Sequence, residues 1–187
     1  MEIQVGVSNH HIHLTREILD KLFGEGYELT NKRDLVQKGQ FACEETVTLE
    51  KNGKVLEHIR IIGPCRKYTQ VELLEKDNLY FEMEAPVRAS GDLVGSESIK
   101  IIGPVGEVVI DEGAIVADRH IHMSAEDLVT FGVSNGDVVL VECENGVVMN
   151  NVTIKSDETC VLEYHMNKDE AIDLNIENGM KVTICSK

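Results

Sequence analysis

The sequence predicts a mainly β protein made of two small domains, each an antiparallel β-barrel or sandwich with short capping α-helices. Aromatic residues make up 4% of the chain and Trp is absent, so the core must consist largely of Val, Ile and Leu, which favour pleated surfaces. Short apolar segments alternate with Asn-Gly and Gly-Pro turns. One motif also occurs twice, which predicts two related halves.

The repeated motif spans residues 7–19 and 116–128, and both copies contain His-Ile-His. Each copy reads as a strand, then the His-x-His pair, then a short helix. In the first copy, Ile3, Val5 and Val7 alternate with polar or small residues, as expected of a half-buried strand. Two copies are too few for a solenoid, so a pair of small similar domains is the better interpretation.

The helix that follows each His-x-His pair has start and stop signals. Thr15 and Ser124 are predicted N-caps, and Ser124 forms a capping-box pattern with Asp127. Gly24 and Gly132 are predicted to end these helices.

The remaining signals are mostly hairpins. The predicted pairs are 45–49 with 55–61 across Asn52-Gly53, 99–102 with 107–110 across Gly103-Pro104, and 138–143 with 146–154 across Glu144-Asn145. Asn167 is the predicted cap of one more short helix.

Charge and cysteine content exclude several classes of protein. The net charge of −15 argues against nonspecific binding to nucleic acid or to anionic membranes. No apolar run reaches the ~18 residues that span a bilayer, and the N-terminal residues do not form a signal peptide. The five cysteines are scattered and form no C-x-x-C pair, so neither a disulfide framework nor a cysteine-rich zinc site is expected. We expect a cytoplasmic protein without nucleic-acid or membrane partners.

Five of the seven histidines suggest a metal site, namely His11, His13, His120, His122 and His165. On a strand, residues two apart project from the same face and reach one ion. Neutral imidazole suits zinc, iron, copper or nickel. A single His-x-His pair is no more than a common surface feature, but two pairs at matching places in a repeat favour metal binding. His10 occupies the place of Arg119 and is expected to supply charge or a hydrogen bond.

Two other functions compete at this point. Glu17 and Glu126 complete a His-x-His-x-x-x-Glu spacing typical of cupins, which predicts a double cupin with one metal in each half. Against it, the helix caps Thr15 and Ser124 place both glutamates in a first helical turn, where acidic residues are favoured for structural reasons. A metal-binding module without catalysis is the third hypothesis.

Five segments, in this order, resemble the PduL-type phosphotransacylases, the phosphate propanoyltransferases of propanediol-utilisation systems and their acetate-forming relatives. They are Val7-Ser8-x-x-His11-Ile12-His13-Leu14, Gly63-Pro64-x-Arg66-x-x-Thr69-Gln70-Val71-Glu72, Pro86-x-Arg88-x-Ser90-Gly91-Asp92, Ala117-x-Arg119-His120-Ile121-His122-Met123 and His165-x-x-x-Asp169-Glu170-Ala171. The resemblance covers nearly the whole chain.

The resemblance implies two β-barrel domains, one of residues 1–9 with 118–187 and the other of residues 10–117. It implies transfer of a propanoyl or acetyl group between coenzyme A and inorganic phosphate. Members housed in bacterial microcompartments carry an extension ahead of the first strand, so targeting by that route is not expected here. A homo-oligomer stays open.

The resemblance also implies the site residues. His11, His13 and Glu72 would hold one zinc ion, and His120, His122 and His165 would hold a second. Arg66 is the expected catalytic residue because it would contact phosphate, and Arg66, Arg88 and Arg119 are the expected substrate-binding residues.

Direct attack by phosphate on the thioester needs no enzyme nucleophile. Cys65 lies beside Arg66 and offers an alternative route through an acyl-enzyme. We expect Cys65 to be a small buried apolar residue instead.

Overall fold

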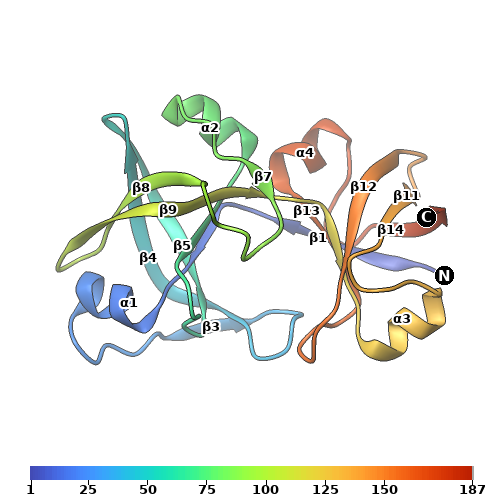
Figure 1. Ribbon diagram of the computed structural model, residues 1–187, viewed down its shortest axis with the longest axis horizontal. Coiled ribbons are helices and arrows are strands. Elements are labelled where there is room, and N and C mark those ends of the chain that lie inside the picture. The colour runs from blue at the N-terminus through green and yellow to red at the C-terminus, as the bar shows by residue number, and fades with distance from the viewer. Residues whose placement is uncertain (187) are drawn as a thin grey trace. The chain divides into compact units, whose positions relative to one another are not determined.

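The computed structural model describes residues 1–186, Ser186 by its backbone alone. Two compact units share the chain (Figure 1). The terminal unit comprises Met1–Asn9, Val36–Lys38 and the described part of Asp118–Lys187. The central unit comprises His10–Leu35 and Gly39–Ala117. By its contacts, Val36–Lys38 therefore belongs with the terminal unit although the residues on both sides of it belong to the other.

The terminal unit is a closed barrel with the strand order β1-β13-β10-β12-β11-β14. Its strands are β1 (Ile3–Ser8), β10 (His120–His122), β11 (Val138–Cys143), β12 (Val148–Lys155), β13 (Glu163–Asn167) and β14 (Lys181–Ser186). Its helices are α3 (Ala125–Phe131) and α4 (Lys168–Asp173). Ile121, Ile154 and Tyr164 are fully buried in its core.

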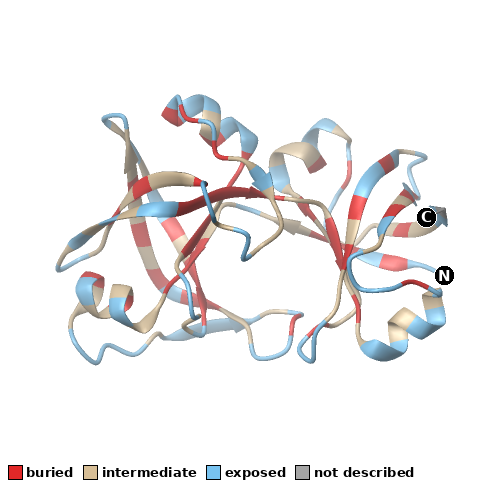
Figure 2. Ribbon diagram, viewed as in Figure 1, coloured by how far each residue is buried: buried red, intermediate tan, exposed pale blue. Residues whose placement is uncertain are grey.

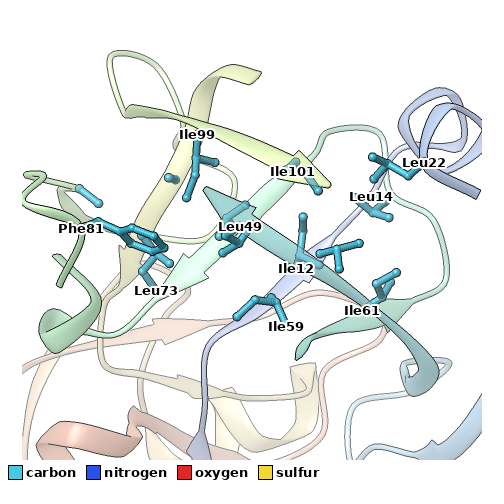
Figure 3. Packing of buried hydrophobic residues seen from close by; sticks show 14 of the residues in the cluster. Ile12, Leu14, Leu22, Leu49, Ile59, Ile61, Leu73, Phe81, Ile99 and Ile101 are labelled. Carbon is cyan, nitrogen blue, oxygen red and sulfur yellow. The ribbon is translucent and has the colours of Figure 1, made fainter. Parts of the chain in front are cut away.

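The central unit is also closed, because β8 pairs with both β4 and β9 and completes the ring β4-β5-β2-β6-β9-β8. Its strands are β2 (His11–His13), β3 (Asn31–Asp34), β4 (Phe41–Lys51), β5 (Lys54–Gly63), β6 (Gln70–Leu73), β7 (Val87–Arg88), β8 (Glu97–Ile102) and β9 (Glu107–Ala117). Its helices are α1 (Arg16–Phe23) and α2 (Glu75–Phe81). Figure 3 shows Ile12, Leu49, Ile59 and Ile101 meeting in a core that is mainly aliphatic. The prediction of a mainly β protein with two small barrels and short helices is confirmed.

The predicted hairpins are confirmed. Strands β4 and β5 pair antiparallel up to Lys51 and Lys54, and β8 pairs with β9 and β11 with β12 in the same way. Asn52 and Gly53 have φ values of 52° and 73°, as a type I′ turn requires at both central residues.

The predicted helix ends are confirmed as well. The Thr15 side chain accepts a hydrogen bond from the Ile18 N–H, and Gly24 follows as the C-cap. Ser124 and Asp127 form the reciprocal capping box of α3, which ends at Gly132. None of the helices in the described chain is long and apolar enough to cross a membrane.

Strand direction differs from the prediction. Both units were expected to be antiparallel, but β1 runs parallel to β13, β10 to β12, β2 to β5, and β6 to β9. The expectation was wrong because turn residues reveal only neighbours that are joined by a hairpin. Parallel neighbours require long connections and leave no local signal.

Helix α2 was also not expected. Its N-cap is Leu74, which has no side-chain oxygen, so the usual start signal is missing. The Asp77 carboxylate instead accepts a hydrogen bond from the Leu74 N–H at 2.9 Å.

The strand registers confirm the internal repeat. In the central unit β2 pairs antiparallel with β6, which places His11 opposite Glu72. In the terminal unit β10 pairs antiparallel with β13, which places His120 opposite His165. Figure 2 shows strand residues alternating between buried and more exposed positions. The isoleucine of each His-x-His pair points into the barrel core, so both histidines point from the opposite face of the sheet.

Candidate metal centres

His120, His122 and His165 form the first cluster, which we call the terminal triad. One donor atom from each residue lies within 4.8 Å of the others. The Nε2 atoms of His120 and His122 are 3.2 Å apart. The His165 ring centroid lies 5.3 Å from that of His120 and 4.8 Å from that of His122.

Each ring of the terminal triad has a partner on one nitrogen. His120 Nδ1 lies 2.8 Å from the Asp118 carbonyl oxygen, and His122 Nδ1 lies 3.4 Å from Cys160 Sγ. His165 Nε2 lies 2.5 Å from a carboxylate oxygen of Glu163. Metal-binding histidines characteristically donate their other N–H in this manner, which fixes the tautomer and the ring orientation.

Two rings of the terminal triad, His120 and His122, are held in the neutral form that binds metal. Burial lowers the pKa of His120, against the opposing hydrogen bond to Asp118. Burial and the charges of His120, His165 and Lys155 lower the pKa of His122 to about 2. Both imidazoles are therefore neutral at pH 7, with a lone pair available for coordination.

His11, His13 and Glu72 form the second cluster, the central triad, whose donor atoms also lie within 4.8 Å of one another. His11 Nε2 is 3.4 Å from one oxygen of Glu72, and His13 Nε2 is 3.8 Å from the other. The two rings are nearly perpendicular at 87° with centroids 5.0 Å apart. Here too one ring nitrogen is occupied, because His13 Nδ1 donates to the Ile62 carbonyl oxygen at 3.1 Å.

His13 is the buried member of the central triad. Burial, followed by the charges of His11 and Arg66, lowers the pKa of His13 well below its usual value. His13, His120 and His122 thus offer neutral imidazole nitrogens, and Glu72 adds a carboxylate to the central triad. This donor set fits zinc, and three protein donors leave a coordination position for substrate or water.

Arg66 lies next to the segment that follows His13, and its charge contributes to the lowered pKa of that histidine. Its backbone N–H donates to the Leu14 carbonyl oxygen at 2.8 Å, which ties it to the segment that follows His13. One guanidinium nitrogen lies 3.4 Å from Gln40 Oε1. Among the residues that the structure describes, this guanidinium forms no ion pair with a carboxylate, and a cation of this kind suits an anionic ligand.

Arg88 and Arg119 are more firmly bound to protein groups. Arg88 donates to the Val94 carbonyl oxygen at 2.7 Å and to Asp92 at 3.3 Å, within its own turn. Arg119 donates to the Asn150 carbonyl oxygen at 2.9 Å and forms an ion pair with Glu170. A substrate-binding role for either stays a prediction.

A family model described as phosphate propanoyltransferase matches residues 4–177 of the chain. The chain belongs to the phosphate propanoyltransferase family. It is 45% identical over 185 residues to the phosphate propanoyltransferase of Thermotoga maritima, covering 97% of this chain and 88% of the relative. It is also 45% identical to that of Lachnoclostridium phytofermentans (97% and 86% covered) and 40% identical over 179 residues to that of Salmonella typhimurium (94% and 85%).

The cupin interpretation is wrong for this member of the phosphate propanoyltransferase family, because the two glutamates do not join the histidines. Glu17 lies in the first turn of α1 with its side chain 75% exposed, and it pairs with Lys21 at 2.6 Å rather than with the histidines. Glu126 occupies the same place in α3. Both glutamates are therefore acidic residues of a first helical turn, as the predicted helix caps indicated, and not cupin metal ligands.

The sequence did not predict a role for several residues that contact the triads of this phosphate propanoyltransferase family member or, in the case of Gln37, contact a neighbour of a triad. They are Gly6, Gln37, Asp118, Cys160, Glu163 and the role of Gln70. One available signal was the period-2 pattern itself, because Gln70 and Glu163 each precede a predicted metal ligand by two residues on one strand. Gln37 carried no such signal, since its contact spans 126 residues of sequence.

Proposed function

We propose that the chain transfers a propanoyl group between coenzyme A and inorganic phosphate, with one zinc ion at each triad. The observation that carries this proposal is the family match over residues 4–177, together with relatives named phosphate propanoyltransferase at 39% to 45% identity. The two triads of convergent imidazole and carboxylate donors support the metal requirement.

In the proposed reaction a phosphate oxygen attacks the carbonyl carbon of the acyl-CoA thioester. A carbon–oxygen bond forms, the carbon–sulfur bond breaks, and coenzyme A leaves as the thiolate while the acyl phosphate is released. When bound, zinc supplies Lewis acidity towards the carbonyl oxygen and affinity for the thiolate. The remaining requirements fall to the side chains.

Arg66 is the proposed phosphate ligand. The chain carries a net charge of −15, so an anion must be held by a local cation, and the Arg66 guanidinium has a planar fork that matches phosphate oxygens. We keep Arg88 and Arg119 as proposed substrate contacts. Each already donates to a backbone carbonyl, so replacing either by Ala is expected to reduce kcat/KM less than Arg66→Ala does.

Acetyl-CoA is proposed as a second substrate. The acetyl and propanoyl groups differ by one methylene, which changes binding in a fitted pocket by only ~1–3 kcal/mol. The ratio of kcat/KM for the two thioesters measures this preference. Equal values would indicate a pocket that does not contact the terminal methyl group.

Removing one donor of the terminal triad tests the site. We expect His120→Ala and His165→Ala to lose bound zinc and transferase activity together, measured by elemental analysis of the purified protein and by thiol release. His58→Asn is the matched control, because His58 is exposed and its φ of 62° is one that Asn readily adopts. Full zinc content in both alanine variants would overturn the assignment of the terminal triad.

A further inference from the structure

Each triad has a polar neighbour at a matching place in its unit, and neither neighbour has a role in the proposed reaction. Gln70 lies opposite His13 in the register of the central unit, and Glu163 lies opposite His122 in the terminal unit. Each precedes the third donor of its triad by two residues on the same strand, so the two side chains share one face of the sheet. Gln70 therefore corresponds to Glu163 as Glu72 corresponds to His165.

Each neighbour hydrogen-bonds to the third donor with matching chemistry. Gln70 Nε2 donates to Glu72 Oε1 at 2.6 Å, so an amide donor meets a carboxylate acceptor. His165 Nε2 lies 2.5 Å from Glu163 Oε2, so a ring N–H meets a carboxylate acceptor. Where the third donor changes from carboxylate to imidazole, the neighbour changes from donor to acceptor. Both triads thus keep a hydrogen bond between the neighbour and the third donor, with the donor and acceptor exchanged.

A second set of contacts holds each neighbour in place. Gln37 Nε2 donates to Glu163 Oε2 and to the Val161 carbonyl oxygen, both at 3.0 Å, and Gln37 Oε1 accepts from the Val161 N–H at 2.9 Å. Gln37 lies in Val36–Lys38, the segment that joins the terminal unit by its contacts. A glutamine that satisfies both its donor and acceptor groups in this way has one fixed orientation.

In the central unit, the donor and acceptor groups of the Gln70 side chain also both have hydrogen-bond partners. Its side chain is fully buried, and its Nε2 also lies 2.8 Å from Ser90 Oγ. Its Oε1 accepts from the Gly91 N–H at 2.7 Å. Gly91 has a φ of +95°, which only glycine adopts readily, and Arg88 ties the same turn together through Val94. The turn at 88–94 is thereby linked to Glu72.

We propose that Gln70 and Glu163 are positioning residues that select which atom of the third donor faces the metal. Glu163 accepts the Nε2–H of His165 and leaves Nδ1 free for zinc. Gln70 holds Oε1 of Glu72 by its hydrogen bond, and Oε2, the oxygen nearer His11, is the proposed metal donor. The proposal rests on the metal centres of the proposed function.

Nitrogen-15 NMR of zinc-loaded protein labelled at histidine tests the His165 assignment directly. We expect His165 to coordinate through Nδ1, with its proton on Nε2, whereas His120 and His122 coordinate through Nε2 with protons on Nδ1. Coordination of His165 through Nε2 would overturn the proposal for Glu163. A wild-type protein in which none of these rings binds zinc would overturn the metal centre of the proposed function as well.

Zinc affinity, measured by competition with a chelator, tests both positioning residues. Glu163→Met and Gln70→Met are expected to weaken zinc binding at one triad by ~10–100-fold, the usual effect of losing a hydrogen bond to a metal ligand. At a chelator concentration where the wild type retains zinc at both triads, each variant should retain it at one. The matched controls are Glu158→Met and Gln4→Met, which alter exposed residues and should leave affinity unchanged.

Two other outcomes separate this inference from the proposed function. If wild-type protein binds zinc at both triads and both variants match their controls, Gln70 and Glu163 do not position the donors, and the proposed function stands. Circular dichroism establishes that each variant is folded. If Glu163→Met fails to fold, Gln37→Met offers a second route, because it removes the support of Glu163 while leaving Glu163 itself in place. If Gln70→Met fails to fold, Ser90→Ala does the same for Gln70.

Discussion

A histidine binds zinc as the neutral imidazole, and burial keeps His13, His120 and His122 in that form. Burying these rings costs free energy, which is offset by a hydrogen bond on the ring nitrogen that points away from the other triad residues. An example is the bond from His13 Nδ1 to the Ile62 carbonyl oxygen. Metal binding then requires no proton release from these three residues. The pairing of His-x-His with buried backbone acceptors explains why both clusters are preformed.

Cys65 is expected to take no covalent part in catalysis. Burial raises the pKa of its thiol, although the charge of Arg16 opposes this, so the group is protonated and weakly nucleophilic at neutral pH. Cys65→Ser should keep kcat within about twofold of the wild type, and initial-rate kinetics should be sequential. Ping-pong kinetics, or loss of turnover in Cys65→Ser, would instead favour an acyl-enzyme.

Gly6 is expected to be required for space rather than for backbone freedom. A Cβ atom at this position would lie 2.6 Å from a Glu163 oxygen and 2.9 Å from His165 Cδ2, so Gly6→Ala must displace that pair. We expect weaker zinc binding and lower activity with an unchanged circular dichroism spectrum. Gln4→Ala, an exposed change on the same strand, is the control. Unchanged zinc affinity in Gly6→Ala would contradict the tight packing of the pair.

At the scale of elements, the helix that follows each His-x-His pair starts from a strong cap. The Ser124 hydroxyl accepts from the Asp127 N–H at 3.2 Å, and the Asp127 carboxylate accepts from the Ser124 N–H at 2.9 Å. Ser124→Ala should lower the free energy of unfolding by ~1 kcal/mol, as measured by chemical denaturation. Thr130→Ala, on the exposed face of the same helix, should change it by less than about 0.5 kcal/mol. Equal effects would mean that the cap contributes little.

Elements with local signals were predictable from the sequence, and elements with distant partners were not. The Asn52-Gly53 turn fixes the conformation of its own hairpin, so the prediction needed no other part of the chain. The pairing of β1 with β13 depends on residues that lie far apart in sequence, and neither strand contains a local signal that predicts a parallel pairing. The same reason hid Gln37, whose position is set by contacts with Val161 and Glu163.

At the scale of the whole molecule, the internal repeat made the site predictable. Two matched His-x-His pairs indicated metal binding, and the family resemblance supplied Glu72 and His165 as third donors. The structure brings each predicted trio together as a triad. Neither third donor followed from spacing alone, because each reaches its histidines through an antiparallel strand pair that the sequence did not reveal.

The measurement that bears most directly on function is release of free coenzyme A thiol from propanoyl-CoA, followed with a thiol reagent. We expect release that requires inorganic phosphate, stops when the protein is stripped of metal with a chelator, and returns when zinc is added. Protein denatured by heat provides the background rate. Absence of phosphate-dependent release from protein with zinc at both triads would contradict the proposed transferase activity.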